Sequence, residues 1–228
     1  RHHLRLQAPG TYDLIALEPP PIGYAGVASL YSRDFYALAR TRLAAGGYVS
    51  QWLPSYQVPN ATTLSMIRAF IDVFPNAVLL SGAEADLILV GGRDAITVDP
   101  QALLARMAAR PQVRADLARL DLGTPREIVG MFLGSSAMLA EATRSAPPVT
   151  DDRPIQEYGV RSLLNLGESV PGAVVDLTRV AEWCLGCFAD GTPVPVVEGL
   201  DVYLSLLGSA YAATDRKSTR LNSSHVSE

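Results

Sequence analysis

One carboxylate stands out because of its place in the sequence. Glu18 ends the apolar run Tyr12–Leu17 and is followed by Pro19, Pro20 and Pro21. An acid at the carboxyl end of a buried strand lies where open α/β sheets bind ligands. There it could attract a cation or act as a general base. The prolines favour a rigid turn with few N–H donors, so Pro19 and Pro20 are candidate cofactor contacts through their carbonyls. The simpler alternative is a surface acid ahead of a proline-rich turn.

A second apolar run ends in residues that suit an amine ligand. Gln51 and Trp52 close the run Tyr48–Leu53, at the same predicted edge as Glu18. An amide oxygen can accept a hydrogen bond from an ammonium group, and a tryptophan face can hold a cation. Tyr56 follows in a loop and is a further candidate for lining this site. The alternative is that Trp52 belongs to the core and Gln51 to the surface.

A charged turn at Thr150–Pro154 supplies two more candidate ligands. Asp151 and Asp152 could return over the pocket and add negative charge for a cationic substrate. The favoured alternative is structural: a turn with an internal ion pair to Arg153, which contributes little when exposed.

The string Trp183-Cys-Leu-Gly-Cys187 is similar to a thioredoxin active site. A redox dithiol requires a preceding strand and a helix that begins at the first cysteine, which lowers its pKa. Gly186 and the following Asp190-Gly-Thr-Pro193 indicate a turn instead. Zinc would need two further ligands, and the sequence offers no second cysteine pair, so we expect no metal site. A plain turn with free thiols or a local disulfide is the favoured interpretation.

The elements that would position these residues form an α/β pattern. Two apolar runs flank a helix that Ser32 caps, a second helix follows from Asn60 or Thr62 to Val73, and an antiparallel hairpin then closes the sheet edge. The predicted strands are 12–17, 48–53, 77–80 and 85–90. We interpret this as the second half of a Rossmann-like sheet, and we expect the glycine-rich first half to precede Arg1.

The chain divides by composition into four parts. Residues 1–95 form the sheet, residues 96–160 a helical extension of the same domain, and residues 161–214 a helical and loop appendage. The segment 215–228 is rich in serine and contains the chain's first lysine, Lys217. We interpret this tail as a disordered artefact that resembles translated sequencing adapter; a natural disordered tail is the alternative.

Composition excludes several classes of protein. The net charge of −4 argues against a nucleic-acid surface, which usually carries a basic patch. No apolar run approaches the roughly 18 residues that a membrane span needs. Two cysteines cannot form a disulfide framework and leave the redox compartment undetermined, with a reducing cytoplasm as the default.

Several ordered motifs together resemble the spermidine synthase family. They are Asp13-Leu-Ile-Ala-Leu-Glu18-Pro-Pro, Gly26-Val-Ala-Ser-Leu-Tyr-Ser-Arg-Asp-Phe-Tyr36, Leu43-Ala-Ala-Gly-Gly-Tyr-Val-Ser-Gln-Trp-Leu-Pro54 and Thr150-Asp-Asp-Arg-Pro-Ile-Gln-Glu-Tyr158. The resemblance covers about residues 1–160. It is closest to bacterial spermidine-synthase-like domains, which are often fused to membrane segments.

The resemblance implies a methyltransferase-like fold and aminopropyl transfer from decarboxylated S-adenosylmethionine to a diamine such as putrescine. Glu18 would be the base, Gln51 would lie near the substrate amine, and the donor's glycine-rich loop would lie upstream. Two departures matter: the synthases have aspartate where Glu18 stands and a second acid where Pro21 stands.

Two other functions stay open. One is methyl transfer from S-adenosylmethionine, since Glu-Pro-Pro-Pro is similar to the acidic Pro-Pro motif of amino-methylating enzymes. The other is a module that binds a nucleoside or polyamine without catalysis. We expect a cytoplasmic protein or domain, a possible homodimer, and no catalysis by residues 1–228 alone, which we expect to be marginally stable.

Overall fold

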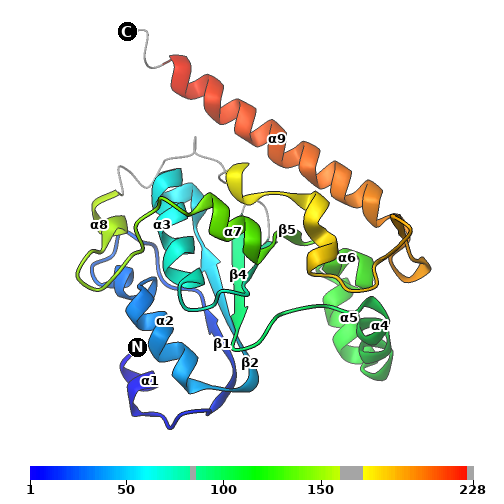
Figure 1. The fold of residues 1–228 in the computed structure, drawn as a ribbon, viewed down its shortest axis with the longest axis horizontal. Helices are drawn as coiled ribbons and strands as arrows, with labels where there is room; N and C mark the ends of the chain where they lie inside the picture. Colours follow the sequence, from blue (N-terminus) through cyan, green and yellow to red (C-terminus); the bar gives the residue numbers. More distant parts are fainter. Residues whose placement is uncertain (83–85, 160–171, 225–228) are drawn as a thin grey trace.

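The computed structural model describes residues 1–82, 86–159 and 172–224, and these form an α/β structure (Figure 1). A five-stranded sheet has the order β1-β2-β4-β3-β5. Only β1 and β2 are parallel; the other pairs are antiparallel. The strands are β1 (Tyr12–Leu17), β2 (Leu43–Leu53), β3 (Val78–Ser81), β4 (Leu87–Gly92) and β5 (Phe132–Gly134), and a separate two-stranded ladder joins β6 (Phe188–Ala189) to β7 (Thr192–Pro193).

The helices lie before, between and after the strands along the chain. The α-helices are α1 (His2–Leu6), α2 (Arg33–Arg42), α3 (Asn60–Ile71), α4 (Pro100–Ala109), α5 (Pro111–Ala118), α6 (Pro125–Val129), α7 (Ser136–Ala142), α8 (Ile155–Gly159) and α9 (Leu200–Ser224). The 3-10 turns are η1 (Val27–Leu30), η2 (Ser55–Gln57), η3 (Gly172–Val174), η4 (Leu177–Glu182) and η5 (Pro195–Val197). Within the described ranges, no helix has both the length and the apolar character to cross a bilayer.

The parallel β1–α2–β2 unit predicted from sequence is confirmed. Ser32 caps α2 as expected: its Oγ accepts a hydrogen bond from the Phe35 N–H at 3.1 Å. β2 begins at Leu43, five residues earlier than expected, because the chain passes through Gly46 at φ 69° and pairs irregularly with the start of β1. A positive φ of this kind is easily adopted only by glycine.

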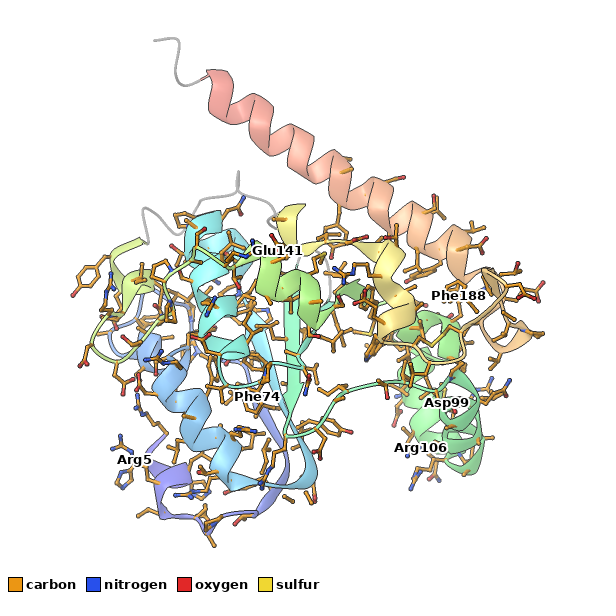
Figure 2. All side chains as sticks on the ribbon, viewed as in Figure 1. Arg5, Phe74, Asp99, Arg106, Glu141 and Phe188 are labelled. Atoms are coloured by element: carbon orange, nitrogen blue, oxygen red, sulfur yellow. A yellow bond between two sulfur atoms is a disulfide. The ribbon has the colours of Figure 1, made fainter. Side chains whose placement is uncertain are left out.

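Two apolar clusters cover opposite faces of the sheet. In β3 and β4, Leu79 and Leu89 belong to a core beneath α2 and α3, whereas Val78, Leu80 and Val90 contact a second core with η4, η5 and α9. This alternation is the two-residue period of a strand. Phe74 points into the first core, between α3 and the sheet (Figure 2).

One part of the sheet is covered on a single face. On β1 and β2, the side chains opposite α2 and α3 are exposed: Leu14 is 58% and Tyr48 is 44% accessible. These two residues are register partners on neighbouring strands. The described residues therefore leave an open apolar strip on the second face of the parallel pair.

Two expectations for the rest of the chain need correction. The stretch predicted as helical after residue 96 also contains β5, which pairs with β3 and so forms the sheet edge in place of the hairpin. Its Phe132 and Leu133 are fully buried, so contacts override the local helical pattern. Within the segment 215–228, which is predicted to be disordered, residues 215–224 continue α9 to Ser224 and past the sheet (Figure 1), whereas residues 225–228 lie outside the described part of the structure. That segment has no glycine or proline to end the helix.

Candidate functional site

The carboxyl ends of β1 and β2 form the edge at which the candidate residues meet. The two parallel strands run in register to the pair Leu17–Gln51. Glu18 and Trp52 are the residues that follow this pair on the two segments. The strand period places Glu18 and Trp52 on the same open face as the pair Leu14–Tyr48.

Glu18 is exposed and available at this edge. It follows the last residue of β1, and its side chain is open to solvent. Among the described residues, none forms a hydrogen bond or ion pair with its carboxylate. A free carboxylate can still attract a cation or take up a proton, whereas one paired with an arginine could not easily do so.

The proline turn after Glu18 is fixed in place by η2. The Ile22 N–H donates to the Gln57 Oε1 at 3.3 Å, and the Tyr24 N–H donates to the Pro21 carbonyl at 3.1 Å. Pro19 is buried and Pro20 is exposed. No described residue donates to either of their carbonyls, so both oxygens could accept from a ligand.

Gln51 lies on the opposite face from Glu18. Its side chain is fully buried toward α2, where its Oε1 accepts from the Tyr36 hydroxyl at 3.1 Å. Its Nε2 donates to the Trp52 carbonyl at 2.9 Å. Burial raises the pKa of Tyr36 well above its ordinary value, so its hydroxyl stays protonated. The structure thus gives this amide a role in the core and does not bring it together with Glu18.

Trp52 and Tyr56 remain near the edge. Trp52 is half-buried, pairs with Ile88 of β4 and, by the strand period, shares the open face with Glu18. Tyr56 lies in η2, which follows β2 directly; its side chain falls outside the described part of the structure.

Asp151 anchors the turn of 150–154 to the start of the chain. Its carboxylate pairs with Arg1 and accepts from the Ser32 Oγ at 2.7 Å. Its backbone N–H donates to Asp34 at 3.0 Å. The hydrogen bond from Arg1 lowers the pKa of Asp151 below its ordinary value. The ion pair expected within the turn thus forms with Arg1, 150 positions away, instead of Arg153.

The Asp151 contacts predict a pH-dependent contribution to stability. A carboxylate with a lowered pKa stabilises the fold above its ordinary pKa of 3.8, and the effect is lost as pH falls through the folded value. We expect Asp151→Asn to lower the free energy of unfolding at pH 7, and the gap from wild type to shrink below about pH 4. Urea unfolding of both proteins from pH 7 to pH 3 measures this. A gap that stays constant with pH would contradict the assignment.

Two side chains of the segment 155–158, which follows this turn, form hydrogen bonds with the loop Gly26–Ala28. Gln156 is fully buried, and its Nε2 donates to the Ala28 carbonyl at 3.0 Å. The Glu157 Oε1 accepts from the Gly26 N–H at 3.1 Å. Both residues lie in the motif 150–158, but the local sequence does not indicate these contacts, because they join positions more than 125 residues apart. These two bonds fix the path of η1 near the candidate site.

Removing the Gln156 contact should destabilise this loop. We expect Gln156→Ala to lower the free energy of unfolding by about 1–3 kcal/mol, because it removes a buried hydrogen bond and leaves a cavity, while the Ala28 carbonyl keeps only its bond from the Tyr31 N–H. Glu157→Gln keeps an acceptor for the exposed Gly26 N–H and should cost less than about 1 kcal/mol. Chemical unfolding of both variants provides the comparison, and equal losses would argue against a specific role for the buried amide.

Asp152 lies beside a separate shallow pocket. It is exposed and lines a space of about 310 Å³ with Arg153, Pro154, Ile155 and Tyr158. Tyr158 is 84% exposed at this rim. The two aspartates of the turn therefore differ: Asp151 is committed to contacts within the protein, whereas Asp152 faces solvent.

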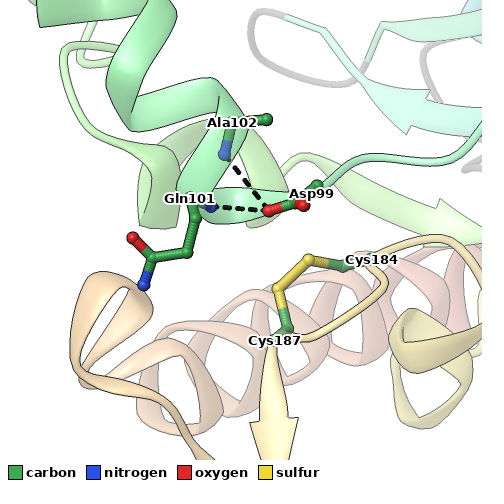
Figure 3. The surroundings of a disulfide bond; sticks show 5 residues. All are labelled: Asp99, Gln101, Ala102, Cys184 and Cys187. Atoms are coloured by element: carbon green, nitrogen blue, oxygen red, sulfur yellow. Dashed lines mark hydrogen bonds between the residues drawn. A yellow bond between two sulfur atoms is a disulfide. The ribbon is translucent and has the colours of Figure 1, made fainter.

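The cysteines of the thioredoxin-like string form a local disulfide (Figure 3). Cys184 and Cys187 are both buried, with Cα atoms 5.6 Å apart. The string follows the 3-10 turn η4. Two backbone hydrogen bonds join it to Val98: the Val98 N–H donates to the Trp183 carbonyl, and the Val98 carbonyl accepts from the Leu185 N–H. No helix begins at the first cysteine, so the local-disulfide alternative fits better than an active dithiol.

Comparison with known proteins adds no family assignment. No protein-family model matches the chain, and no curated protein matches it. Within the described residues, no cluster of three or more histidine, cysteine, aspartate or glutamate side chains could hold a metal ion. The resemblance to spermidine synthases therefore stays a prediction from the sequence motifs.

Proposed function

We propose that this chain belongs to a spermidine-synthase-like transferase in which Glu18 is the general base for an amine acceptor. The observation that carries the proposal is the position of Glu18: an exposed carboxylate with no ion-pair partner among the described residues, at the carboxyl end of β1 and next to the parallel strand β2. In open α/β sheets this edge is the usual ligand site.

The chemistry requires a base at this point. A primary amine near neutral pH is protonated, with a reference pKa of about 10.4. The Glu18 carboxylate would attract the ammonium group and accept its proton. The freed nitrogen would then form a bond to the carbon next to the donor's sulfonium, and the carbon–sulfur bond would break to leave a neutral thioether. Holding the amine, carbon and sulfur in line supplies much of the remaining rate.

The sheet order supports a methyltransferase-like fold as part of this proposal. β4, the second strand of the hairpin, lies next to β2, and β3 lies outside it. An antiparallel strand inserted next to the parallel strands in this way is typical of methyltransferase-like sheets. A sheet built only from strand–helix–strand repeats contains no such hairpin.

The described residues fit only part of a donor site. The free carbonyls of Pro19 and Pro20 could accept from the donor, and Trp52 offers an aromatic face on the same side as Glu18. The resemblance assigns the remaining donor contacts to a glycine-rich loop ahead of Arg1. The donor, once bound, would supply the electrophilic carbon.

One observation favours methyl transfer as a second candidate. Pro21 stands where the synthases carry a second acid, and Asp151, which could have replaced it, is paired with Arg1. The described edge therefore offers a single free carboxylate, Glu18, which suits an acceptor with one amine better than a diamine. S-adenosylmethionine would be the donor in that case.

An assay with paired donors and acceptors tests the proposal. Decarboxylated S-adenosylmethionine and S-adenosylmethionine are each combined with putrescine and with a monoamine, using a chain that includes the segment the resemblance places before Arg1. Aminopropyl transfer to putrescine would support the first candidate, and methyl transfer to the monoamine the second. Donor binding without product in every combination would instead support the non-catalytic module. Native mass spectrometry of the same sample tests the expected homodimer.

A further inference from the structure

A cavity of about 640 Å³ lies beneath the N-terminal half of α9. It involves none of the residues at the edge of β1 and β2. Its walls come from the segment 172–180, from β6 and from α9, and Phe188 lies beside the first turns of that helix (Figure 2). Cavities of about 300–1,000 Å³ are of the size that binds small molecules.

The walls of this cavity are mainly apolar. Its large apolar lining residues are Val175, Leu177, Val180, Phe188 and Leu204. On α9, Gly208 and Ala212 are four residues apart and so lie on one face of the helix, where their small size leaves room. A Cβ atom added at Gly208 would lie 3.2 Å from the Leu177 Cδ1, so a larger residue there would narrow the cavity.

The charge on the cavity wall has one sign. Asp176 and Asp201 are both lining residues, and no lysine, arginine or histidine is among the described residues that line it. Asp176 also caps η4, since its Oδ1 accepts from the Thr178 N–H at 3.1 Å. Tyr211 completes the wall as a neutral group: burial raises the pKa of its hydroxyl to about 12.

We propose that this cavity binds an amphipathic cation, namely a primary amine carried on an apolar body. The apolar walls would bury the body, and Asp201 with Asp176 would attract the ammonium group. An apolar acid of the same size would bring its carboxylate toward two like charges and be rejected. The site is independent of Glu18, so its test does not depend on the proposed transfer reaction.

Three probes of equal chain length separate the contributions of charge and apolar contact. We expect decylammonium to bind this chain about fivefold more tightly than decanol, the effect of roughly 1 kcal/mol for a partly exposed ion pair. Decanoate should bind more weakly than decanol. Isothermal titration calorimetry at low salt and at 0.5 M NaCl provides the dissociation constants, and the preference for decylammonium should fall at high salt.

Variants tie the binding to this cavity. Asp201→Asn should remove most of the preference for decylammonium and leave decanol binding unchanged, while Asp116→Asn, a change at an exposed carboxylate of α5 outside the lining, should alter neither. Gly208→Leu should weaken all probes, and a thermal melt shows whether that variant is folded. Absence of decylammonium binding, equal affinity for the three probes, or an unchanged preference in Asp201→Asn would each overturn the proposal.

Discussion

Replacing Glu18 with glutamine should lower turnover by about 10²- to 10⁴-fold, the usual contribution of a positioned general base. Glutamine has nearly the same shape as glutamate but carries no charge and cannot take up the amine's proton. Because Glu18 is exposed and has no described partner, the change should leave the fold intact. The proposed donor contacts do not include the Glu18 side chain, so the donor's dissociation constant should change by less than about threefold. Steady-state kinetics and donor titration of the longer chain measure the two effects.

Two controls distinguish a base from a group that only attracts the substrate. Glu18→Asp keeps the charge and should recover part of the rate, since the related synthases have aspartate at this position by resemblance. Glu141→Gln changes an exposed glutamate of α7 that pairs with Arg144, and it should have no effect on turnover. Unchanged turnover in Glu18→Gln would remove this residue from the mechanism.

The arrangement around Glu18 was predictable because its signals are local. An apolar run, an acid and three prolines define the end of β1, and Gly46-Gly47 separates the following helix from the next apolar residues. Such patterns determine where strands end, and the ends of parallel strands share an edge. The hairpin was likewise predictable from two short apolar runs, with its boundaries displaced by one or two residues at each end.

The face occupied by Gln51 could also have been found from the sequence. In the run Tyr48–Leu53, the residues Val49, Gln51 and Leu53 alternate with Tyr48, Ser50 and Trp52. The first set is fully apolar apart from Gln51, which predicts that Gln51 is buried with it. Its place at the end of the strand instead suggests a ligand contact. Its partner, Tyr36, could not be identified, because helix packing decides which hydroxyl reaches the amide.

The contacts of the segment after residue 149 depend on distant parts of the chain. Asp151 pairs with Arg1, and Gln156 and Glu157 bond to the loop at Gly26–Ala28. Nothing in the local pattern of 150–158 distinguishes these pairings from an ion pair within the turn. β5 is similar: three residues with a weak local preference become a strand because β3 offers an unpaired edge.

Replacing Phe70 with alanine should cost about 3–5 kcal/mol of unfolding free energy, the usual loss for a buried phenylalanine. Phe70 is fully buried in α3, with its ring 4.9 Å from Tyr36 and 5.0 Å from Phe74. A Cβ added at Gly91 would lie 2.6 Å from its ring, so the ring fills the space above β4 completely. Because Tyr36 also donates a hydrogen bond to Gln51, the space left by the missing ring would weaken the packing that supports β2.

Two further variants serve as controls. Phe70→Leu should cost less free energy of unfolding than Phe70→Ala, since leucine fills most of the space. Leu120→Ala, at a side chain that is 69% exposed, should change the free energy of unfolding by less than about 0.5 kcal/mol. Urea unfolding measures all three variants. A loss below about 1 kcal/mol in Phe70→Ala would mean that α3 does not pack on the sheet as described.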